Sequence, residues 1–174
     1  MMKDKIVLAV PTLENKEEAL KFRQAFYDFG EKTIDGSELL DRIDSYEEWL
    51  ALVTDHANVN ALGVDGILTE TYFALDRNRR IVGIIDFRHA LNDFFKDFGH
   101  SGYSVLPSER RKGYATEMLR LILDRAKACG LTEIQLSALR SNIPSVKTIR
   151  KNGGCYVRSF EFAGETADVY RITL

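Results

Sequence analysis

The sequence predicts a mixed α/β fold in one domain that takes in residues 1–174. Short segments rich in β-branched and aromatic residues alternate with amphipathic segments along the whole chain. No internal repeat, low-complexity segment or linker interrupts that order. With 45% hydrophobic and 29% charged residues, the composition is that of an ordinary globular protein.

The first part of the chain predicts one strand followed by two helices. Ile6 to Val10 is a short apolar strand. A helix is expected from Asn15 to about Phe29, and Gly30 ends it. A second helix begins after Ser45, where a glutamate three residues later completes a capping box.

In the middle of the chain the spacing of apolar residues changes to that of β-strands. Thr71 to Leu75 and Ile81 to Phe87 flank a polar, turn-like segment and therefore predict a hairpin. Gly99 to Leu106 predicts another strand, which ends at Pro107.

The clearest helix follows, because its apolar residues recur at spacings of three and one. They are Ala115, Met118, Leu119, Ile122, Leu123 and Ala126. This spacing places them in one stripe of an α-helix. Beyond it we expect a strand over Ile134 to Ala138, a shorter helix from Asn142 to Asn152, and closing strands at Cys155 to Phe162 and Val169 to Thr173.

Composition also excludes several classes of protein. Cys129 and Cys155 have no metal-ligand or disulfide-framework spacing, and we expect two reduced thiols. No apolar run is long enough for a signal peptide or a membrane span, which predicts a cytoplasmic protein without a membrane partner. The net charge of −2 argues against general nucleic-acid binding.

Charge is unevenly distributed between the two parts of the chain. Residues 1–65 carry a net charge of −7, and residues 66–174 carry +5. Such asymmetry is consistent with two surfaces for ligands of opposite sign. The alternative is that the acidic side chains only cover the solvent-facing sides of the two helices.

One segment has the features of an anion site. In Ser104 to Thr116 a strand ends at a proline, a short basic loop follows, and a helix opens beside Gly113. Free backbone N–H groups at a helix start bind anions, and charge-assisted hydrogen bonds add about 1.5–3 kcal/mol each. A solvated basic turn before an ordinary helix is the alternative for such a loop taken alone.

The pattern Arg110-x-x-Gly113-x-Ala115 resembles the signature of the GNAT superfamily of N-acetyltransferases. Val105-x-Pro107 precedes it at the family's spacing, and the hairpin with Gly83 resembles the family's third strand. The segment from Asn142 to Gly153 resembles the helix of the family's next motif. The resemblance covers about residues 66–160.

This resemblance implies a central mixed, mostly antiparallel sheet of about seven strands, flanked by about four helices and splayed between strands 4 and 5. It implies acetyl-CoA as co-substrate and no metal. Residues 1–65 would form the acceptor side, and residues 66–174 the acetyl-CoA-binding core with the closing strands.

The resemblance also assigns residues to the co-substrate. Backbone groups near Ser104 and Val105 would pair with the pantetheine arm, and those of the turn would hold the pyrophosphate. Asn142 would bond the pantetheine or act only as a helix cap. The full set is Ser104, Val105, Leu106, Arg110, Arg111, Lys112, Gly113, Tyr114, Ala115, Thr116, Asn142 and Ser145.

The acid and the base are less clear from the sequence. Many family members carry a tyrosine acid where this chain has Ile149, so Tyr103, Tyr156, Tyr170 or a water would take its place. The family often uses a carboxylate base early in the fourth strand, where this chain has His100, the first candidate; Asp86 is the second. Val105 or Leu106 would supply an N–H for the charge that develops on the thioester oxygen.

The predicted activity is transfer of an acetyl group to a primary amine, with a catalytically silent acyl-CoA-binding domain as the alternative. The acidic first part of the chain favours a cationic small-molecule or peptide acceptor. A nucleic-acid module is disfavoured because the basic patch spans three residues without interleaved aromatics. Homodimers are common in the resembling family, but the sequence itself does not indicate one.

Overall fold

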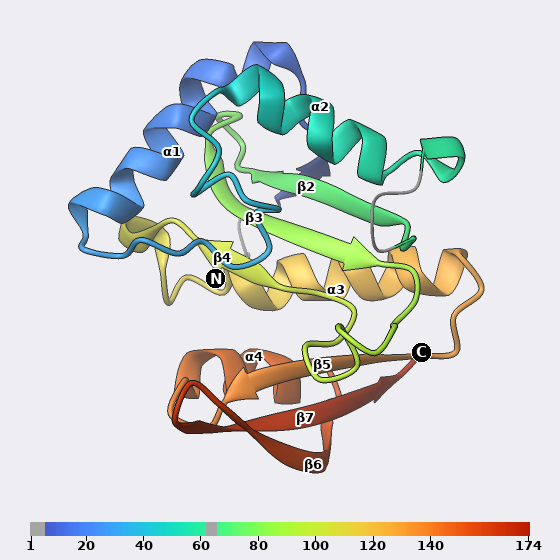
Figure 1. The fold of residues 1–174 in the computed structure, drawn as a ribbon. Helices are drawn as coiled ribbons and strands as arrows, with labels where there is room; N and C mark the ends of the chain where they lie inside the picture. The colour runs from blue at the N-terminus through green and yellow to red at the C-terminus, as the bar shows by residue number, and fades with distance from the viewer. Residues whose placement is uncertain (1–5, 62–65) are drawn as a thin grey trace.

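Seven strands form two sheets in the computed structural model, which describes residues 6–61 and 66–174 (Figure 1). The first sheet has the order β1-β2-β3-β4, and the second has the order β5-β7-β6. All paired strands within them are antiparallel. The bounds are Val7–Ala9 for β1, Thr69–Leu75 for β2, Ile81–Arg88 for β3, Tyr103–Val105 for β4, Glu133–Leu139 for β5, Cys155–Phe162 for β6 and Glu165–Thr173 for β7.

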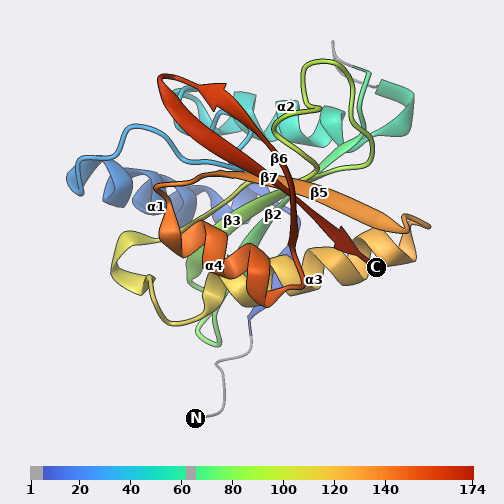
Figure 2. The same ribbon diagram turned by 90° about the horizontal axis from the view of Figure 1, so that it is seen from below.

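Four α-helices pack around the sheets in the described part of the chain: α1 (Lys16–Asp28), α2 (Tyr46–His56), α3 (Tyr114–Ala128) and α4 (Ile143–Lys151). Short 3₁₀ turns lie at Leu13–Asn15, Val59–Ala61 and Pro107–Glu109. The helices α1 and α2 lie on one side of the first sheet, and α3 and α4 lie on the other (Figures 1 and 2). The predicted mixed α/β architecture is confirmed. No described helix is long and apolar enough to cross a membrane.

Two apolar cores follow from this arrangement. One core packs Phe22 of α1 and Trp49 of α2 against Phe73 and Ile84 of the first sheet. The other packs the predicted stripe of α3 against both sheets, with Met118 and Ile122 fully buried. Each buried side chain of this size contributes about 1.5–3 kcal/mol, so the cores hold the elements in place.

The start of α2 has the serine half of the predicted capping box, since the Ser45 hydroxyl accepts a hydrogen bond from the Glu48 N–H at 3.2 Å. The strand predicted over Gly99 to Leu106 is wrong in length, because only Tyr103–Val105 forms β4. Gly99 instead bridges to Leu136 of β5 with φ +85°, and a Cβ there would lie 2.4 Å from the Gln135 oxygen. Only glycine fits such a backbone contact.

The two sheets meet at one end. The His100 N–H donates to the Gln135 oxygen at 2.7 Å, and the Gln135 N–H donates to Nδ1 of His100 at 2.9 Å. Further along, β4 and β5 share no ladder in the described structure. The predicted splay between the fourth and fifth strands is therefore observed, and it divides the predicted single sheet in two.

The loop of residues 30–45 between α1 and α2 is fixed against β4. The Ser104 hydroxyl donates to the Asp35 carbonyl at 2.9 Å, and the Trp49 indole donates to the Ser37 carbonyl at 2.8 Å. Gly36 approaches so closely that a Cβ would lie 2.1 Å from the Gly102 oxygen. The acidic first part of the chain is thereby placed over the start of β4.

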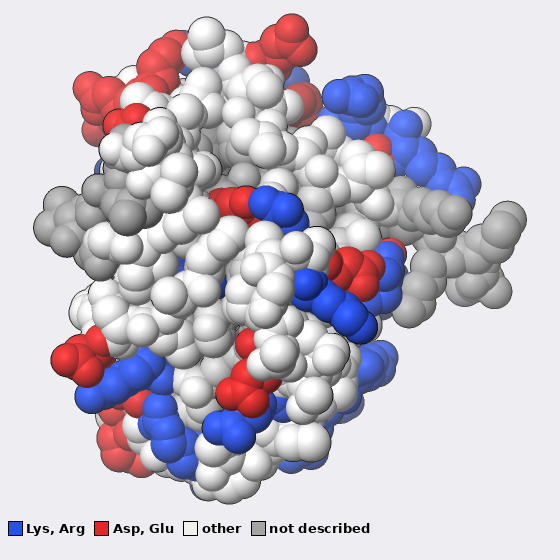
Figure 3. All heavy atoms as spheres, turned by 90° about the vertical axis from the view of Figure 1, so that its right-hand side faces the viewer, with Lys and Arg blue, Asp and Glu red and all other residues white. Residues whose placement is uncertain are grey.

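The surface in Figure 3 shows how the charges are arranged on one face. Acidic side chains are prominent at the top, over the α2 end, and the lower part around the second sheet carries both signs around a mostly uncharged centre. Many basic groups on this face lie beside acidic ones. On this face, acidic and basic groups therefore partly balance one another.

Candidate functional site

The edge of β4 that faces away from β3 presents backbone groups. The Leu106 N–H donates to the Val82 oxygen at 2.9 Å, and the Asp86 N–H donates to the Gly102 oxygen at 3.1 Å. In an antiparallel ladder these bonds alternate, so the groups of Ser104 also face β3. The N–H and C=O groups of Tyr103 and the N–H of Val105 consequently face the open edge, whereas the Val105 carbonyl accepts a hydrogen bond from Nε of Arg110 at 3.2 Å.

This register bears on the two donors that the sequence leaves open for the thioester oxygen, Val105 and Leu106. The Leu106 N–H is already bonded to the Val82 oxygen. The backbone of Ser104 is directed to Ile84 of β3, and its hydroxyl bonds the loop above. Val105 therefore supplies the N–H that an extended ligand chain could meet at this edge.

Beyond β4 the chain turns into the start of α3 with donors exposed. Arg111 and Gly113 have left-handed backbones, with φ +64° and +88°. The N–H groups of Arg111, Lys112, Gly113, Ala115 and Thr116 form no hydrogen bond with any residue that the structure describes. No described atom lies within 4 Å of the position that a Cβ of Gly113 would take. Such a turn of free amides at a helix start has the geometry of an anion site.

The three basic side chains of this turn have different partners. Arg110 pairs with both carboxylate oxygens of Glu31 at 2.7 and 2.6 Å and lies over the rings of Phe26 and Phe29. This hydrogen-bonded pair lowers the pKa of Glu31. Lys112 pairs with Glu109 at 2.8 Å. Arg110 and Lys112 are thus each paired with a carboxylate, and Arg110 joins the turn to the loop that follows α1.

Arg111 is the remaining cation of the turn. It is exposed, and it forms no ion pair within residues 6–61 and 66–174. Tyr114 is buried in the core, whereas Ala115 and Thr116 are only partly buried at the first turn of α3. The site is thus made mainly of backbone amides, with one exposed cation beside them.

Tyr103 extends from β4 to the first turn of α4. Its hydroxyl lies 2.9 Å from the Ser145 hydroxyl, and burial raises the pKa of this phenol to about 12. Asn142 caps α4 by accepting the Ser145 N–H at 3.3 Å, so its predicted capping alternative is observed. The phenol therefore stays protonated at neutral pH, next to the open edge of β4.

The other candidate acids lie elsewhere. Ile149, at the position where the family often has a tyrosine, is fully buried in the core. Tyr170 is buried on β7, and Tyr156 is exposed on β6 with its hydroxyl 2.9 Å from Ser159. Of the three tyrosines considered from the sequence, Tyr103 is the one on β4.

His100 joins the two sheets through its hydrogen bonds to Gln135. Its Nδ1 accepts the Gln135 N–H, which requires the proton of a neutral ring to be on Nε2. Burial lowers the pKa of His100, so the ring is neutral at physiological pH. A base at this position would have to release a backbone hydrogen bond.

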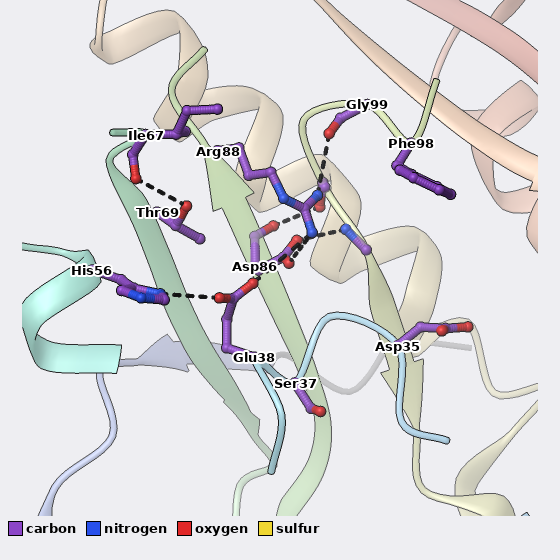
Figure 4. A network of polar contacts seen from close by, with 12 residues as sticks. Asp35, Ser37, Glu38, His56, Ile67, Thr69, Asp86, Arg88, Phe98 and Gly99 are labelled. Carbon is purple, nitrogen blue, oxygen red and sulfur yellow. Dashed lines mark hydrogen bonds and ion pairs between the residues drawn. The ribbon is translucent and has the colours of Figure 1, made fainter. Parts of the chain in front are cut away.

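Asp86 is the centre of a buried polar network (Figure 4). The fully buried carboxylate accepts the Gly102 N–H at 2.6 Å and pairs with Arg88 at 2.7 Å. Glu38 lies 3.9 Å from Arg88 and 3.2 Å from Nδ1 of His56. One guanidinium thus faces two carboxylates. Burial, opposed by Arg88 and reinforced by Glu38, raises the pKa of Asp86.

The network joins four elements and fixes the start of β4. Sequence reasoning selected Asp86 but not Glu38 or Arg88. Asp86 and Arg88 are two residues apart on one strand, so the sequence indicates that they share a face of the sheet. The approach of Glu38 and His56 depends on the loop between α1 and α2, whose course no local sequence pattern predicts.

Two surface hollows lie away from the open edge. A hollow of about 340 Å³ is lined by Tyr27, Gly30, Lys32 and Asp41. A smaller one of about 90 Å³ lies between α2 and the β2 edge. Among the described residues, no cluster of His, Cys, Asp and Glu has an arrangement that would hold a metal ion. The open edge and the amide turn remain the features with ligand-binding geometry.

Comparison with protein families gives a match over residues 16–154 to the acetyltransferase (GNAT) domain. No curated protein matches the sequence.

Solved structures share the fold at low identity. Mycobacterium smegmatis RimJ in complex with CoA-disulfide has a TM-score of 0.71 and 17% identity, with 97% of this chain and 81% of that chain covered. The microcin C7 self-immunity acetyltransferase MccE, in complex with acetyl-CoA and AMP, has a TM-score of 0.70, 17% identity and coverages of 98% and 93%. The spermidine/spermine N-acetyltransferase SpeG from Vibrio cholerae has a TM-score of 0.65, 14% identity and coverages of 97% and 93%.

The raised pKa of Asp86 predicts a pH dependence of stability. A raised carboxyl pKa favours the fold most below the unfolded-state value near 4, and this contribution is lost as pH rises through the folded-state pKa. The free energy of unfolding of the wild type, relative to Asp86→Asn, should therefore fall with pH across that window, by at most about 1.4 kcal/mol per pH unit. Urea unfolding at a series of pH values measures this difference. A difference that rises with pH would mean that Arg88 keeps Asp86 ionised.

Proposed function

The chain belongs to the GNAT family of acetyltransferases, and on that premise we propose that it transfers an acetyl group from acetyl-CoA to a primary amine. The observation that carries the proposal is the open edge of β4, which leads directly into the free amides at the start of α3. An extended arm and an anionic group are the two parts of coenzyme A that these features suit.

In this proposal different residues of the site bind different parts of the co-substrate. Tyr103 pairs with the pantetheine arm through its backbone N–H and C=O, and Val105 pairs with it through its N–H, since the Val105 carbonyl is bonded to Arg110. The amides from Arg111 to Thr116 hold the pyrophosphate, with the Arg111 side chain beside it. Asn142 and Ser145 face the arm from α4. Acetyl-CoA supplies an activated acetyl group, and the Val105 N–H stabilises the charge that develops on the thioester oxygen.

Tyr103 is the proposed proton donor to the departing thiolate. Its hydroxyl lies beside Ser145 at the first turn of α4, and its pKa of about 12 keeps it protonated. It would thereby replace the tyrosine that the family often places where this chain has the buried Ile149.

The proposed acceptor is a cationic amine that approaches from the side of residues 1–65. Several acids there already have partners: Glu31 binds Arg110, Glu38 binds His56, and Asp41 accepts the Ile34 N–H. Charge complementarity therefore rests on fewer carboxylates than the sequence indicated. The spermidine/spermine N-acetyltransferase SpeG, which shares the fold, is compatible with this class of acceptor.

A catalytically silent acyl-CoA-binding domain is the second candidate function. The burial of Ile149 favours it, because no hydroxyl stands at that position. The Tyr103 hydroxyl next to Ser145 favours the enzyme.

Release of free thiol from acetyl-CoA tests the function directly. With a set of primary amines that includes spermidine, an aminoglycoside and a basic peptide, the wild type should release thiol with at least one cationic amine. Mass spectrometry should find the acetylated product. Acetyl-CoA binding without thiol release would leave the silent domain as the function, and no binding would overturn both.

Arg111→Glu should weaken acetyl-CoA binding at least tenfold, which corresponds to about 1.4 kcal/mol. The change reverses the one cation of the turn without an ion pair in the described structure. Isothermal titration measures the dissociation constant. Lys127→Glu makes the same change of charge near the other end of α3 and should leave the constant within twofold. Equal constants for wild type and Arg111→Glu would contradict the phosphate assignment.

Tyr103→Phe should lower kcat at least tenfold while the dissociation constant of acetyl-CoA changes little, because the variant loses only the proton donor. Tyr156→Phe removes a distant hydroxyl and serves as the control. If kcat is the same in Tyr103→Phe and wild type, a water or another group protonates the thiolate.

A further inference from the structure

Asp35 carries a carboxylate that the fold leaves without a partner among the described residues. Its backbone carbonyl accepts the Ser104 hydroxyl, but its side chain forms no hydrogen bond or ion pair there. In Figure 4 this side chain lies apart from the network of Glu38, Asp86 and Arg88 and points away from it, past β4. It is exposed to solvent. A substrate can therefore reach it.

The residues around Asp35 hold it in one place. Ile34 is buried in the core of α1 and α2, and its N–H is bonded to Asp41 at 2.9 Å. On the other side, Gly36 contacts the backbone of Gly102, and the Ser37 carbonyl is bonded to Trp49. An exposed carboxylate between two anchored neighbours is preorganised for a ligand.

Asp35 also lies close to the reacting end of the proposed site. It is joined to β4 through Ser104, whose neighbours Tyr103 and Val105 face the open edge. The negative charge of Asp35 contributes to the raised pKa of Tyr103, after the larger effect of burial. Asp35 therefore lies beside the strand that carries the phenol.

The other basic groups of the region are less suited to contact an amine. Asp86 is fully buried and already bonded to Gly102 and Arg88. His100 uses Nδ1 to join the two sheets. Glu31 is paired with Arg110. Asp35 is the exposed carboxylate next to β4 whose oxygens are not committed within the described structure.

Building on the proposed function, we propose that Asp35 is the catalytic base: it binds the ammonium group of the acceptor and takes its proton before attack. The freed lone pair then forms the N–C bond to the acetyl carbon, and the C–S bond breaks with its electron pair on sulfur. Sulfur gains a proton from Tyr103, which recovers one from the nitrogen. The products are the amide and the free thiol, and the proton on Asp35 passes to water.

The surroundings of Asp35 set the pH range of this step. Partial desolvation, and then the negative charges of Asp41 and Glu31 on its own loop and of Asp86 on β3, raise its pKa. Tyr103 is the titratable group that faces it from β4. A base with a raised pKa is unprotonated only above that value. Turnover by the wild type should therefore increase with pH through the titration of Asp35.

The test compares Asp35→Asn with Asp28→Asn, which makes the same change of charge on an exposed residue at the end of α1. With the best cationic amine of the thiol-release assay, kcat/KM at pH 7 should fall at least 100-fold in Asp35→Asn and stay within twofold in Asp28→Asn. The loss should shrink at alkaline pH, where the amine deprotonates in solution. Titration of the same amine without acetyl-CoA should show weaker binding to Asp35→Asn.

The outcomes separate this inference from the proposed function. If the wild type releases thiol and Asp35→Asn matches it at every pH, Asp35 is not the base, although the enzyme assignment stands. A loss of activity that is the same at every pH, with unchanged amine binding, would show a structural role and would also overturn the inference. If the wild type releases no thiol with any amine, the proposed function fails and this inference fails with it.

Discussion

The open edge of β4 depends on the point at which the two sheets meet. Two hydrogen bonds between His100 and Gln135, with the Gly99 bridge beside them, join the sheets at one end. Because α3 and α4 pack into the shared core, β4 and β5 diverge from that point instead of pairing along their length. The backbone groups of Tyr103 and the N–H of Val105 are therefore left facing this edge. A ligand-binding edge thus follows from packing, and it needs few specialised side chains.

The buried network of Asp86, Arg88, Glu38 and His56 fixes the position of the same strand, β4. Two carboxylates around one guanidinium are costly to bury. Here they bind Gly102 and draw the loop between α1 and α2 onto the start of β4. The loop then holds Asp35 beside the edge, while Arg110 and Glu31 tie the amide turn to the same loop.

Local patterns predicted most of the elements, since hydrophobic period, caps and turn residues are short-range properties. The α3 stripe, the Ser45 cap and the strand Cys155–Phe162 are examples. The length of β4 was wrong because contacts of Gly99 with β5, distant in the sequence, bend the chain away. The partners of Arg110 and Lys112 were also unpredictable, because a basic residue in a motif does not reveal which carboxylate the fold brings to it. The turn itself was recognisable because its glycine and its place before a helix are local features.

The central claim is that the amides at the start of α3 bind the diphosphate of coenzyme A. A crystal structure of the protein with coenzyme A tests it most directly. The diphosphate oxygens should accept hydrogen bonds from N–H groups between Arg111 and Thr116, with the pantetheine arm along Tyr103 and Val105. A diphosphate bound elsewhere, or a helix start left without ligand at saturating coenzyme A, would contradict the claim.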